Sequence, residues 1–204
     1  MDHKRILFIG DSITEWGRFE DEANMGENYV RMIRDYFAVH KPDQFPEVIN
    51  RGIGGNRMTD LVARWQDDVI AHNPDLVSIS IGVNDVWRQV DGSNIEQVYP
   101  EQYEKLLRQL IDQTKSELNA EIILMEPTII AEDVQSEGNQ KLVAYVEAVN
   151  RVAKDYQLTV VPTHQAFINY LNSKRPLPLT IDGVHMSTTG NALMAKTWLE
   201  TVVK

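Results

Sequence analysis

Residues 6–10, Ile-Leu-Phe-Ile-Gly, form an apolar run of strand length that leads directly into Asp-Ser-Ile-Thr-Glu at residues 11–15. Residues 76–81, Leu-Val-Ser-Ile-Ser-Ile, form a second such run, and longer amphipathic stretches separate the apolar runs from one another. Strands that alternate with helices are typical of a parallel sheet covered by helices on both faces. The sequence therefore predicts an α/β fold with residues 76–81 as the central strand.

The same pattern predicts five strands, at residues 6–10, 47–50, 76–81, 121–125 and 158–161. Helices are predicted where apolar residues recur three and four positions apart, at residues 27–37, 59–70, 100–118, 140–156 and 188–203. The stretches predicted to be irregular are residues 11–26, 84–99 and 172–187. In an open parallel sheet, ligands bind beyond the carboxyl ends of the strands. Ser12, Gly55 and Asn84 each follow a predicted strand, so we expect them to gather at that edge.

Composition limits the classes of function. The 204 residues are 43% hydrophobic and 25% charged, which fits one domain over residues 1–204. The formal net charge is -10 and Lys and Arg do not cluster, which argues against nucleic acid and membranes as partners. The chain has no cysteine, which excludes disulfides and thiolate catalysis. The first apolar run ends at Gly10, too early for a signal peptide, so a cytoplasmic location is expected.

Ser12 is the first candidate for chemistry, because a serine at a strand-to-helix turn exposes its hydroxyl beside free backbone N–H groups. A serine becomes an effective nucleophile when an imidazole takes its proton and a carboxylate orients the imidazole. His185 and Asp182, which precede the last predicted helix, offer these two groups. Two structural alternatives stay open: Ser12 and Glu15 fit a capping box, and Asp182 fits an ordinary Asp-Gly turn beside a surface histidine.

Gly55 and Asn84 are candidates for stabilising negative charge. A glycine backbone can approach a ligand closely and point an N–H group at it, and a side-chain amide is a further donor. The presence of Gly55 and of Asn84 at these positions also has a simpler, structural explanation. The glycines at residues 52–55 fit a tight turn, or the start of a dinucleotide fingerprint whose third glycine is replaced by Arg57. Asn84 fits a helix cap or an Asx-turn.

The other histidines are weaker candidates. His3 and His40 lie in polar stretches and His72 stands near a predicted helix end, whereas His164 follows the last predicted strand and is expected near the same edge. No pair of histidines has the spacing of a metal motif such as His-Glu-x-x-His, so no metal site is predicted.

Four short blocks resemble, in order and spacing, the motif blocks of the SGNH or GDSL-type hydrolases: Gly10-Asp11-Ser12, Gly55, Gly82-x-Asn84-Asp85 and Asp182-x-x-His185. The resemblance covers essentially the whole chain. It implies a flavodoxin-like, three-layer α/β/α fold with strand order 2-1-3-4-5. It also implies serine esterase activity without a cofactor.

The resemblance assigns roles as well. It implies Ser12, Asp182 and His185 as catalytic residues, and an oxyanion hole made by the N–H groups of Ser12 and Gly55 and the side chain of Asn84. We therefore expect a small ester as the substrate.

Residues 50–88 are similar to the branch of the family that contains acetylxylan esterases acting on xylo-oligosaccharides. This similarity implies an acetylated sugar as the substrate, bound by Asp11, Trp87 and Arg88. Trp87 and Arg88 also fit a surface stack or a contact in a homo-oligomer. Two positions depart from many relatives: Met186 stands where proline follows the histidine, and Gly54 where serine precedes the glycine. These departures concern the substrate pocket and leave the catalytic groups in place.

Two other functions stay open. One is a short-chain lipase or thioesterase of the same family, although the sequence has no long apolar lid segment. The other is a non-catalytic flavodoxin-like module that binds a nucleotide or flavin phosphate at Gly54-Gly55, although such binding gives no reason for the pair Asp182 and His185.

Overall fold

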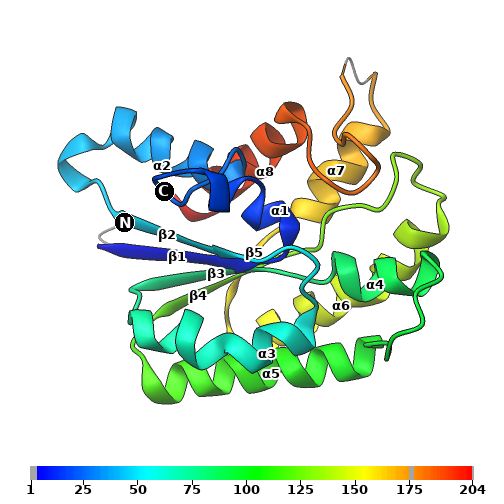
Figure 1. Ribbon diagram of the computed structural model, residues 1–204, viewed down its shortest axis with the longest axis horizontal. Helices are drawn as coiled ribbons and strands as arrows, with labels where there is room; N and C mark the ends of the chain where they lie inside the picture. Colours follow the sequence, from blue (N-terminus) through cyan, green and yellow to red (C-terminus); the bar gives the residue numbers. More distant parts are fainter. Residues whose placement is uncertain (1–3, 175–176, 204) are drawn as a thin grey trace.

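The computed structural model describes residues 4–174 and 177–203, and its centre is one parallel β-sheet (Figure 1). The strands lie in the order β2-β1-β3-β4-β5. Their bounds are Arg5–Gly10 for β1, Glu47–Gly52 for β2, Leu76–Ser80 for β3, Glu121–Met125 for β4 and Thr159–Val161 for β5. The predicted strand order is confirmed, and β3 is the central strand. His3 lies outside the described residues.

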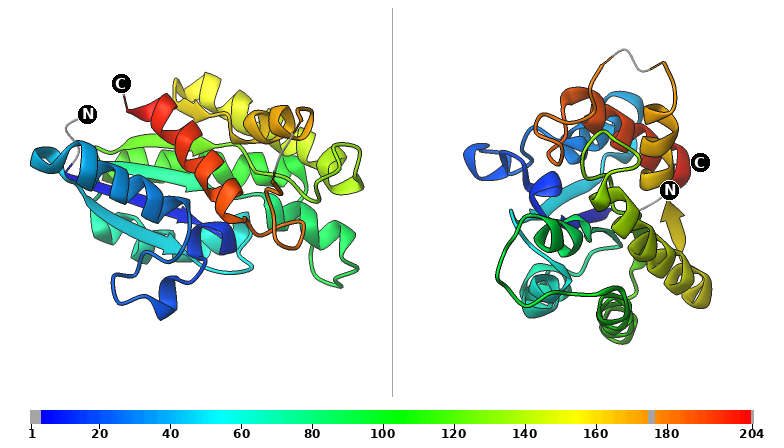
Figure 2. Two further views of the ribbon diagram at one scale, coloured as in Figure 1. Left: turned by 90° about the horizontal axis from the view of Figure 1, so that it is seen from above. Right: turned by 90° about the vertical axis from the view of Figure 1, so that its right-hand side faces the viewer.

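Helices cover both faces of the sheet, which confirms the predicted three layers (Figures 1 and 2). One face carries α2 (Tyr29–His40), α7 (Thr163–Leu171) and α8 (Thr188–Val202). The other carries α3 (Met58–Asp68), α5 (Pro100–Glu117) and α6 (Glu137–Tyr156). Two short helices, α1 (Ser12–Glu15) and α4 (Val83–Val90), follow β1 and β3 at the carboxyl edge of the sheet. Short 3-10 helices lie at Arg18–Glu20, Pro42–Gln44 and Ile70–His72.

The inner strands β1 and β3 are buried on both faces, which explains why both are mainly apolar in the sequence. Phe8 of β1 packs against Tyr29 of α2 and Trp198 of α8, with ring centroids 5.9 and 5.3 Å apart. The indole N–H of Trp198 donates to the hydroxyl of Ser78 at 3.0 Å, so the polar groups in this part of the core are paired. The core therefore fixes the position of β1 and of the turn that follows it.

Two stretches that were predicted to be irregular contain helices. Residues 84–99 include most of α4, and residues 11–26 include α1 and a 3-10 helix. The prediction missed them because α1 has four residues and α4 has eight, too few to repeat an apolar pattern. The helix α7 was not predicted either, and it buries only Thr163 and Phe167.

Capping side chains set the helix ends. The helix α2 begins two residues later than predicted, because the side chain of Asn28 accepts the N–H groups of Val30 and Arg31. The helix α6 begins three residues earlier than predicted, because Ser136 accepts the N–H of Asn139.

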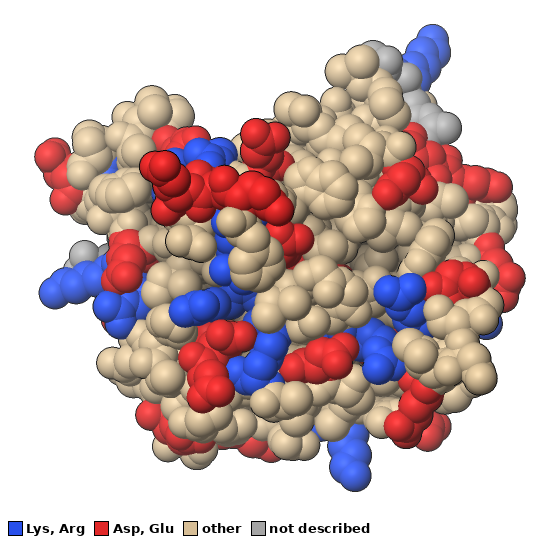
Figure 3. All heavy atoms as spheres, viewed as in Figure 1, with Lys and Arg blue, Asp and Glu red and all other residues tan. Residues whose placement is uncertain are grey.

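Acidic and basic side chains are interleaved on the face of the molecule in Figure 3, without a continuous basic area on that face. Within the described residues, no helix has both the length and the apolar character needed to cross a membrane.

Candidate active site

One cavity at the carboxyl edge of the sheet is lined by Ser12, Gly55, Asn84, Asp182 and His185, and its volume is about 420 Å³. Ser12 is the first residue of α1 after β1, Gly55 follows β2, and Asn84 lies in the first turn of α4 after β3. Asp182 and His185 come from the segment that precedes α8. The structure thus brings the three residues expected at this edge together with Asp182 and His185, which were expected on the loop before the last helix.

His185 lies between Ser12 and Asp182. Its Nε2 atom is 3.0 Å from Oγ of Ser12, and its Nδ1 atom is 2.6 Å from Oδ2 of Asp182. The other carboxylate oxygen of Asp182 accepts the backbone N–H groups of Val184 at 3.0 Å and of His185 at 2.8 Å. Desolvation raises the pKa of Asp182, but these hydrogen bonds outweigh it and lower that pKa below its ordinary value. An ionised Asp182 favours the tautomer in which Nδ1 donates and Nε2 accepts the proton of Ser12.

Asp11, rather than Ser12, caps the helix α1. Its side chain accepts the backbone N–H of Ile13 at 2.9 Å, so the capping-box interpretation of Ser12 and Glu15 is wrong. Asp11 is 2% exposed and is not among the residues that line the cavity, so its placement does not support the expected contact with substrate. Burial raises the pKa of Asp11 to about 6.

Three N–H donors belong to the residues around Ser12. Because Ser12 is the first residue of α1, its own backbone N–H has no acceptor within the helix. Gly55 has φ = 77°, a conformation that favours glycine. The side-chain amide of Asn84 donates one N–H to the carbonyl of Asn56 at 3.1 Å, which restrains the amide and leaves its second N–H. Such donors can stabilise an oxyanion formed at Ser12.

The close approach of α1 to the end of β2 holds Ser12 in place. A Cβ atom on Gly52 would lie 2.2 Å from the backbone nitrogen of Glu15, so no larger residue fits there without a shift of the backbone. Two side-chain amides also hold the end of α1: Asn28 and Asn50 donate to the carbonyl of Thr14 at 2.9 and 2.7 Å. Both asparagines are buried, so these bonds are shielded from water.

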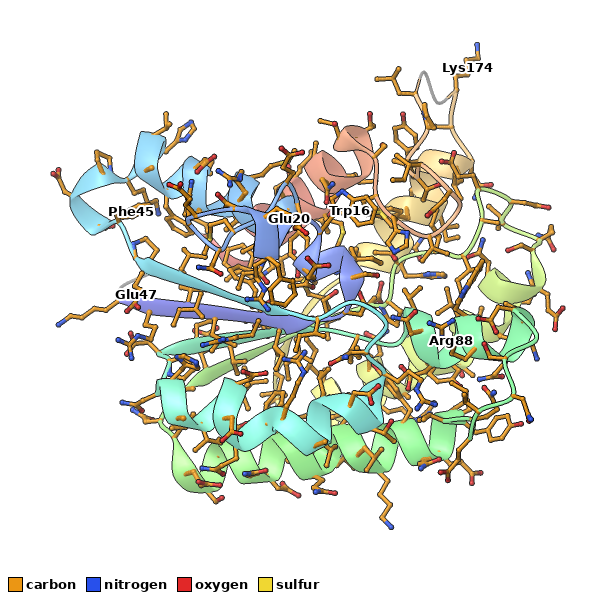
Figure 4. The ribbon with its side chains drawn as sticks, viewed as in Figure 1. Trp16, Glu20, Phe45, Glu47, Arg88 and Lys174 are labelled. Carbon is orange, nitrogen blue, oxygen red and sulfur yellow. The ribbon has the colours of Figure 1, made fainter. Side chains whose placement is uncertain are left out.

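The cavity is also lined by Trp87 and Arg88 of α4. Arg88 forms an ion pair with Asp91 at 2.7 Å, and its other Nη atom would lie 3.8 Å from a Cβ atom on Gly55. Figure 4 labels Arg88 on α4 and Trp16 beside α1, on two different sides of the sheet edge. Trp87 and Arg88 therefore border the same cavity as Ser12 and His185.

Trp16 was missed by the sequence analysis. It lies at the end of α1 with its ring tilted against that of His185, the ring centroids being 4.7 Å apart and the angle between the planes 33°. Its position four residues after Ser12, about one helical turn away, is the signal that could have indicated it.

Glu132, in the loop after β4, was also missed. Its Oε1 atom accepts the backbone N–H groups of Leu179 and Thr180, both at 2.8 Å, and the hydroxyl of Thr180 at 2.9 Å. These bonds tie the segment that carries Asp182 and His185 to the sheet edge. The only sequence signal is that this loop follows a predicted strand at the same edge.

The other described histidines, at positions 40, 72 and 164, are not among the residues that line the cavity. The Nδ1 atom of His164 is 2.6 Å from the carbonyl oxygen of Thr128, and His40 is exposed and stacks on Tyr36. In the part of the chain that the structure describes, no group of three or more His, Cys, Asp or Glu side chains is placed to hold a metal ion.

Comparison with known proteins gives concordant results. Residues 8–193 match the model of the GDSL-like Lipase/Acylhydrolase family. An acetylxylan esterase of Geobacillus stearothermophilus is 37% identical over 206 residues, which cover 98% of this chain and 94% of that protein.

Solved structures show the same relationships. The crystal structure of that enzyme, Axe2, matches with a TM-score of 0.90. Its catalytic mutants include substitutions of a serine, and of an aspartate and a histidine that are three positions apart. LAE5, an alpha/beta hydrolase enzyme from the metagenome of Lake Arreo in Spain, is 32% identical over 97% of this chain and 94% of its own, with a TM-score of 0.89.

Proposed function

The chain belongs to the GDSL-like Lipase/Acylhydrolase family and is an ester hydrolase, and we propose that it removes O-acetyl groups from acetylated xylo-oligosaccharides with Ser12 as the nucleophile. The observation that carries the proposal is the row of contacts from Ser12 through His185 to Asp182, at 3.0 and 2.6 Å. A serine, an imidazole and a carboxylate at these distances are the groups that acyl transfer requires.

In the first half of the reaction, Oγ of Ser12 attacks the carbonyl carbon of the acetyl ester while its proton passes to Nε2 of His185. Asp182 stabilises the imidazolium that forms. The carbonyl oxygen becomes an oxyanion, which accepts hydrogen bonds from the N–H groups of Ser12 and Gly55 and from the amide of Asn84. The imidazolium then gives its proton to the sugar oxygen as the carbon–oxygen bond breaks, which releases the sugar and leaves an acetyl group on Ser12.

Water completes the cycle through the same groups. His185 takes a proton from a water molecule, whose oxygen attacks the acetyl carbon and forms a second oxyanion at the same donors. When this intermediate collapses, the bond to Oγ breaks and Ser12 regains its proton from His185. Acetate is the second product.

The walls of the cavity support a short acyl group on a sugar. Asn84, Arg88 and Asp182 are polar or charged and border a cavity of about 420 Å³, which suits an acetyl group and hydroxyl groups better than a long alkyl chain. The indole of Trp87 can lie against a sugar ring, and the guanidinium of Arg88 can donate to sugar hydroxyls. The acetylxylan esterase that is 37% identical to this chain supports the same substrate class.

The decisive experiment compares the wild type with Ser12→Ala, using p-nitrophenyl acetate and an acetylated xylo-oligosaccharide. We expect the variant to lose activity by about 10³-fold or more, because its remaining groups supply no nucleophile. A fluorophosphonate should label only the wild type, on the peptide that contains Ser12. An Ser12→Ala variant that works at the parental rate would refute the assignment.

A second assay tests the acyl group. The wild type should hydrolyse p-nitrophenyl acetate faster than p-nitrophenyl octanoate, and faster hydrolysis of the octanoate would favour the lipase or thioesterase alternative.

The cytoplasmic location and the homo-oligomer considered from the sequence stay predictions. Cell fractionation can test the location, and light scattering can test the oligomeric state.

A further inference from the structure

Trp16 contacts the imidazole of His185 in a different way from Ser12 and Asp182. Ser12 and Asp182 hydrogen-bond to the two ring nitrogens, so they hold the imidazole at its edge. The indole of Trp16 lies over a face of the ring, with centroids 4.7 Å apart and 33° between the planes. A ring held only at its edge can still tilt out of its plane, and an indole against its face limits that movement.

The backbone of Trp16 is itself well anchored. Its N–H donates to the carbonyl of Ser12 at 2.9 Å, and its own carbonyl accepts the N–H of Glu27 at 2.8 Å. A Cβ atom on Gly26 would lie 2.3 Å from that carbonyl oxygen, so the neighbouring chain packs closely here. The proposed nucleophile and the indole that faces the proposed base therefore belong to one fixed turn of the chain.

We propose that Trp16 is a positioning residue, which keeps the imidazole of His185 aligned with Ser12 and favours the imidazolium formed during catalysis. The face of an indole attracts a cation, more strongly than the face of a phenyl ring does. This contact therefore gains strength when the proton of Ser12 moves to Nε2 of His185. The inference rests on the proposed function, because it takes His185 to be the base.

Three ionisable groups contact the imidazole, interact with it electrostatically or line the same cavity, and they have to be kept unchanged in a test. Asp182 lies on the segment of His185 itself, buried Asp11 at the start of α1 acts on it electrostatically, and Arg88 of α4 lines the same cavity. Substitution of Trp16 by an uncharged residue leaves all three in place. Its effect on the pH dependence of the reaction can therefore be attributed to the indole.

The first experiment compares Trp16→Leu and Trp16→Phe with the wild type on p-nitrophenyl acetate. Trp16→Leu should lower kcat by about 10- to 100-fold with little change in KM, because the base loses its alignment. The acid limb of its pH–rate profile should move to lower pH, because the indole no longer favours the imidazolium. Trp16→Phe keeps an aromatic face and should recover most of both effects.

Phe45→Leu is the matched control, because it also replaces an aromatic ring by leucine. Phe45 is 49% exposed, and Figure 4 labels it far from Trp16. It should leave kcat and the pH–rate profile unchanged. A Trp16→Leu variant with the same acid limb as Phe45→Leu would overturn the proposal, even if its rate were lower, because the indole would then serve only packing.

Fluorescence gives a second measurement that does not depend on turnover. An imidazolium quenches the emission of an indole that it touches, so wild-type emission should fall on acidification over the pH range of the acid limb. This transition should be absent from both Trp16→Phe and His185→Ala. A wild-type transition that persists in Trp16→Phe would contradict the contact.

Activity in Ser12→Ala would refute the proposed function. If Ser12→Ala were inactive and Trp16→Leu had the kinetics of the wild type, only this inference would be refuted.

Discussion

The Nε2 atom of His185 lies 3.0 Å from the Oγ atom of Ser12, although 173 positions separate the two residues in the chain. Ser12 is positioned by β1, whose apolar residues are completely buried in the middle of the sheet. His185 is positioned by a segment that is hydrogen-bonded to Glu132 after β4 and that leads into α8. The contact therefore depends on the packed sheet as a whole, and it can be weakened from either side.

Asp182→Asn should lower kcat by roughly 10²- to 10⁴-fold, because a neutral amide neither selects the productive tautomer of His185 nor stabilises its cation. The change is conservative for the loop, since the Asn carbonyl oxygen can still accept the N–H groups of Val184 and His185 that Oδ1 of Asp182 accepts now. Steady-state kinetics with p-nitrophenyl acetate measure the loss, and thermal unfolding checks that the fold is kept. Wild-type kcat in this variant would show that the carboxylate has no catalytic role.

Asn84→Ala should lower kcat by about 10²- to 10³-fold with little change in KM, because the amide contacts the carbonyl oxygen most strongly when that oxygen is negatively charged. Asn119→Ala is the matched control. Asn119 is exposed and lies two residues before β4, at the amino edge of the sheet, whereas the cavity lies at the carboxyl edge. A rise in KM by a similar factor, with unchanged kcat, would instead indicate that Asn84 binds the substrate and the transition state equally well.

The sequence predicts the sheet well because β1 and β3 are buried on both faces, so both strands are mainly apolar. The five residues around the cavity could be predicted because each motif block lies at a strand end or before the last helix. The cap of α1 could not be decided, since Asp11 and Ser12 are adjacent and both are good capping residues. Only the geometry shows that Asp11 accepts the N–H of Ile13.

The contacts of Trp16 and Glu132 could not be predicted for another reason. Trp16 meets His185 and Glu132 meets Thr180 only after distant segments have packed together, and neither contact leaves a periodic pattern in the sequence. The helix α4 was missed because its eight residues are too few to repeat an apolar pattern, and its contacts with distant segments leave no sequence signal either. The backbone N–H of Met58, for example, donates to the carboxylate of Asp85 at 3.1 Å.

Gly52→Ala should destabilise the fold by about 1 to 3 kcal/mol and reduce activity, because the new methyl group would push against the backbone of α1. Gly54→Ala is the matched control for stability. A Cβ atom on Gly54 would meet nothing closer than 3.8 Å, whereas one on Gly52 would lie 2.2 Å from the nitrogen of Glu15. Urea unfolding of both variants measures the difference, and equal stability would show that α1 can move away from β2 at little cost.

Two buried carboxyl groups, Asp11 and Asp85, lie beneath the site and interact electrostatically with each other. The pKa of Asp85 is raised to about 7, mainly by burial; the N–H of Met58 lowers this pKa and the charge of Asp11 adds to its rise. The folded state therefore binds a proton at Asp85 more tightly than the unfolded chain does. For a group with a raised carboxyl pKa, the free energy of unfolding falls as the pH rises through the interval between the unfolded and folded values, here from about 4 to about 7.

Asp85→Asn should remove this dependence, because the amide stays neutral while its carbonyl oxygen can still accept the N–H of Met58. We expect the variant and the wild type to be similarly stable near pH 4 and the variant to be more stable near pH 8, by at most about 4 kcal/mol. Urea unfolding at several pH values across this range measures the two curves. Asp43→Asn, at an exposed carboxylate, should leave the wild-type curve unchanged. If Asp85→Asn lost stability with rising pH as steeply as the wild type, the buried carboxyl of Asp85 would not be the group responsible.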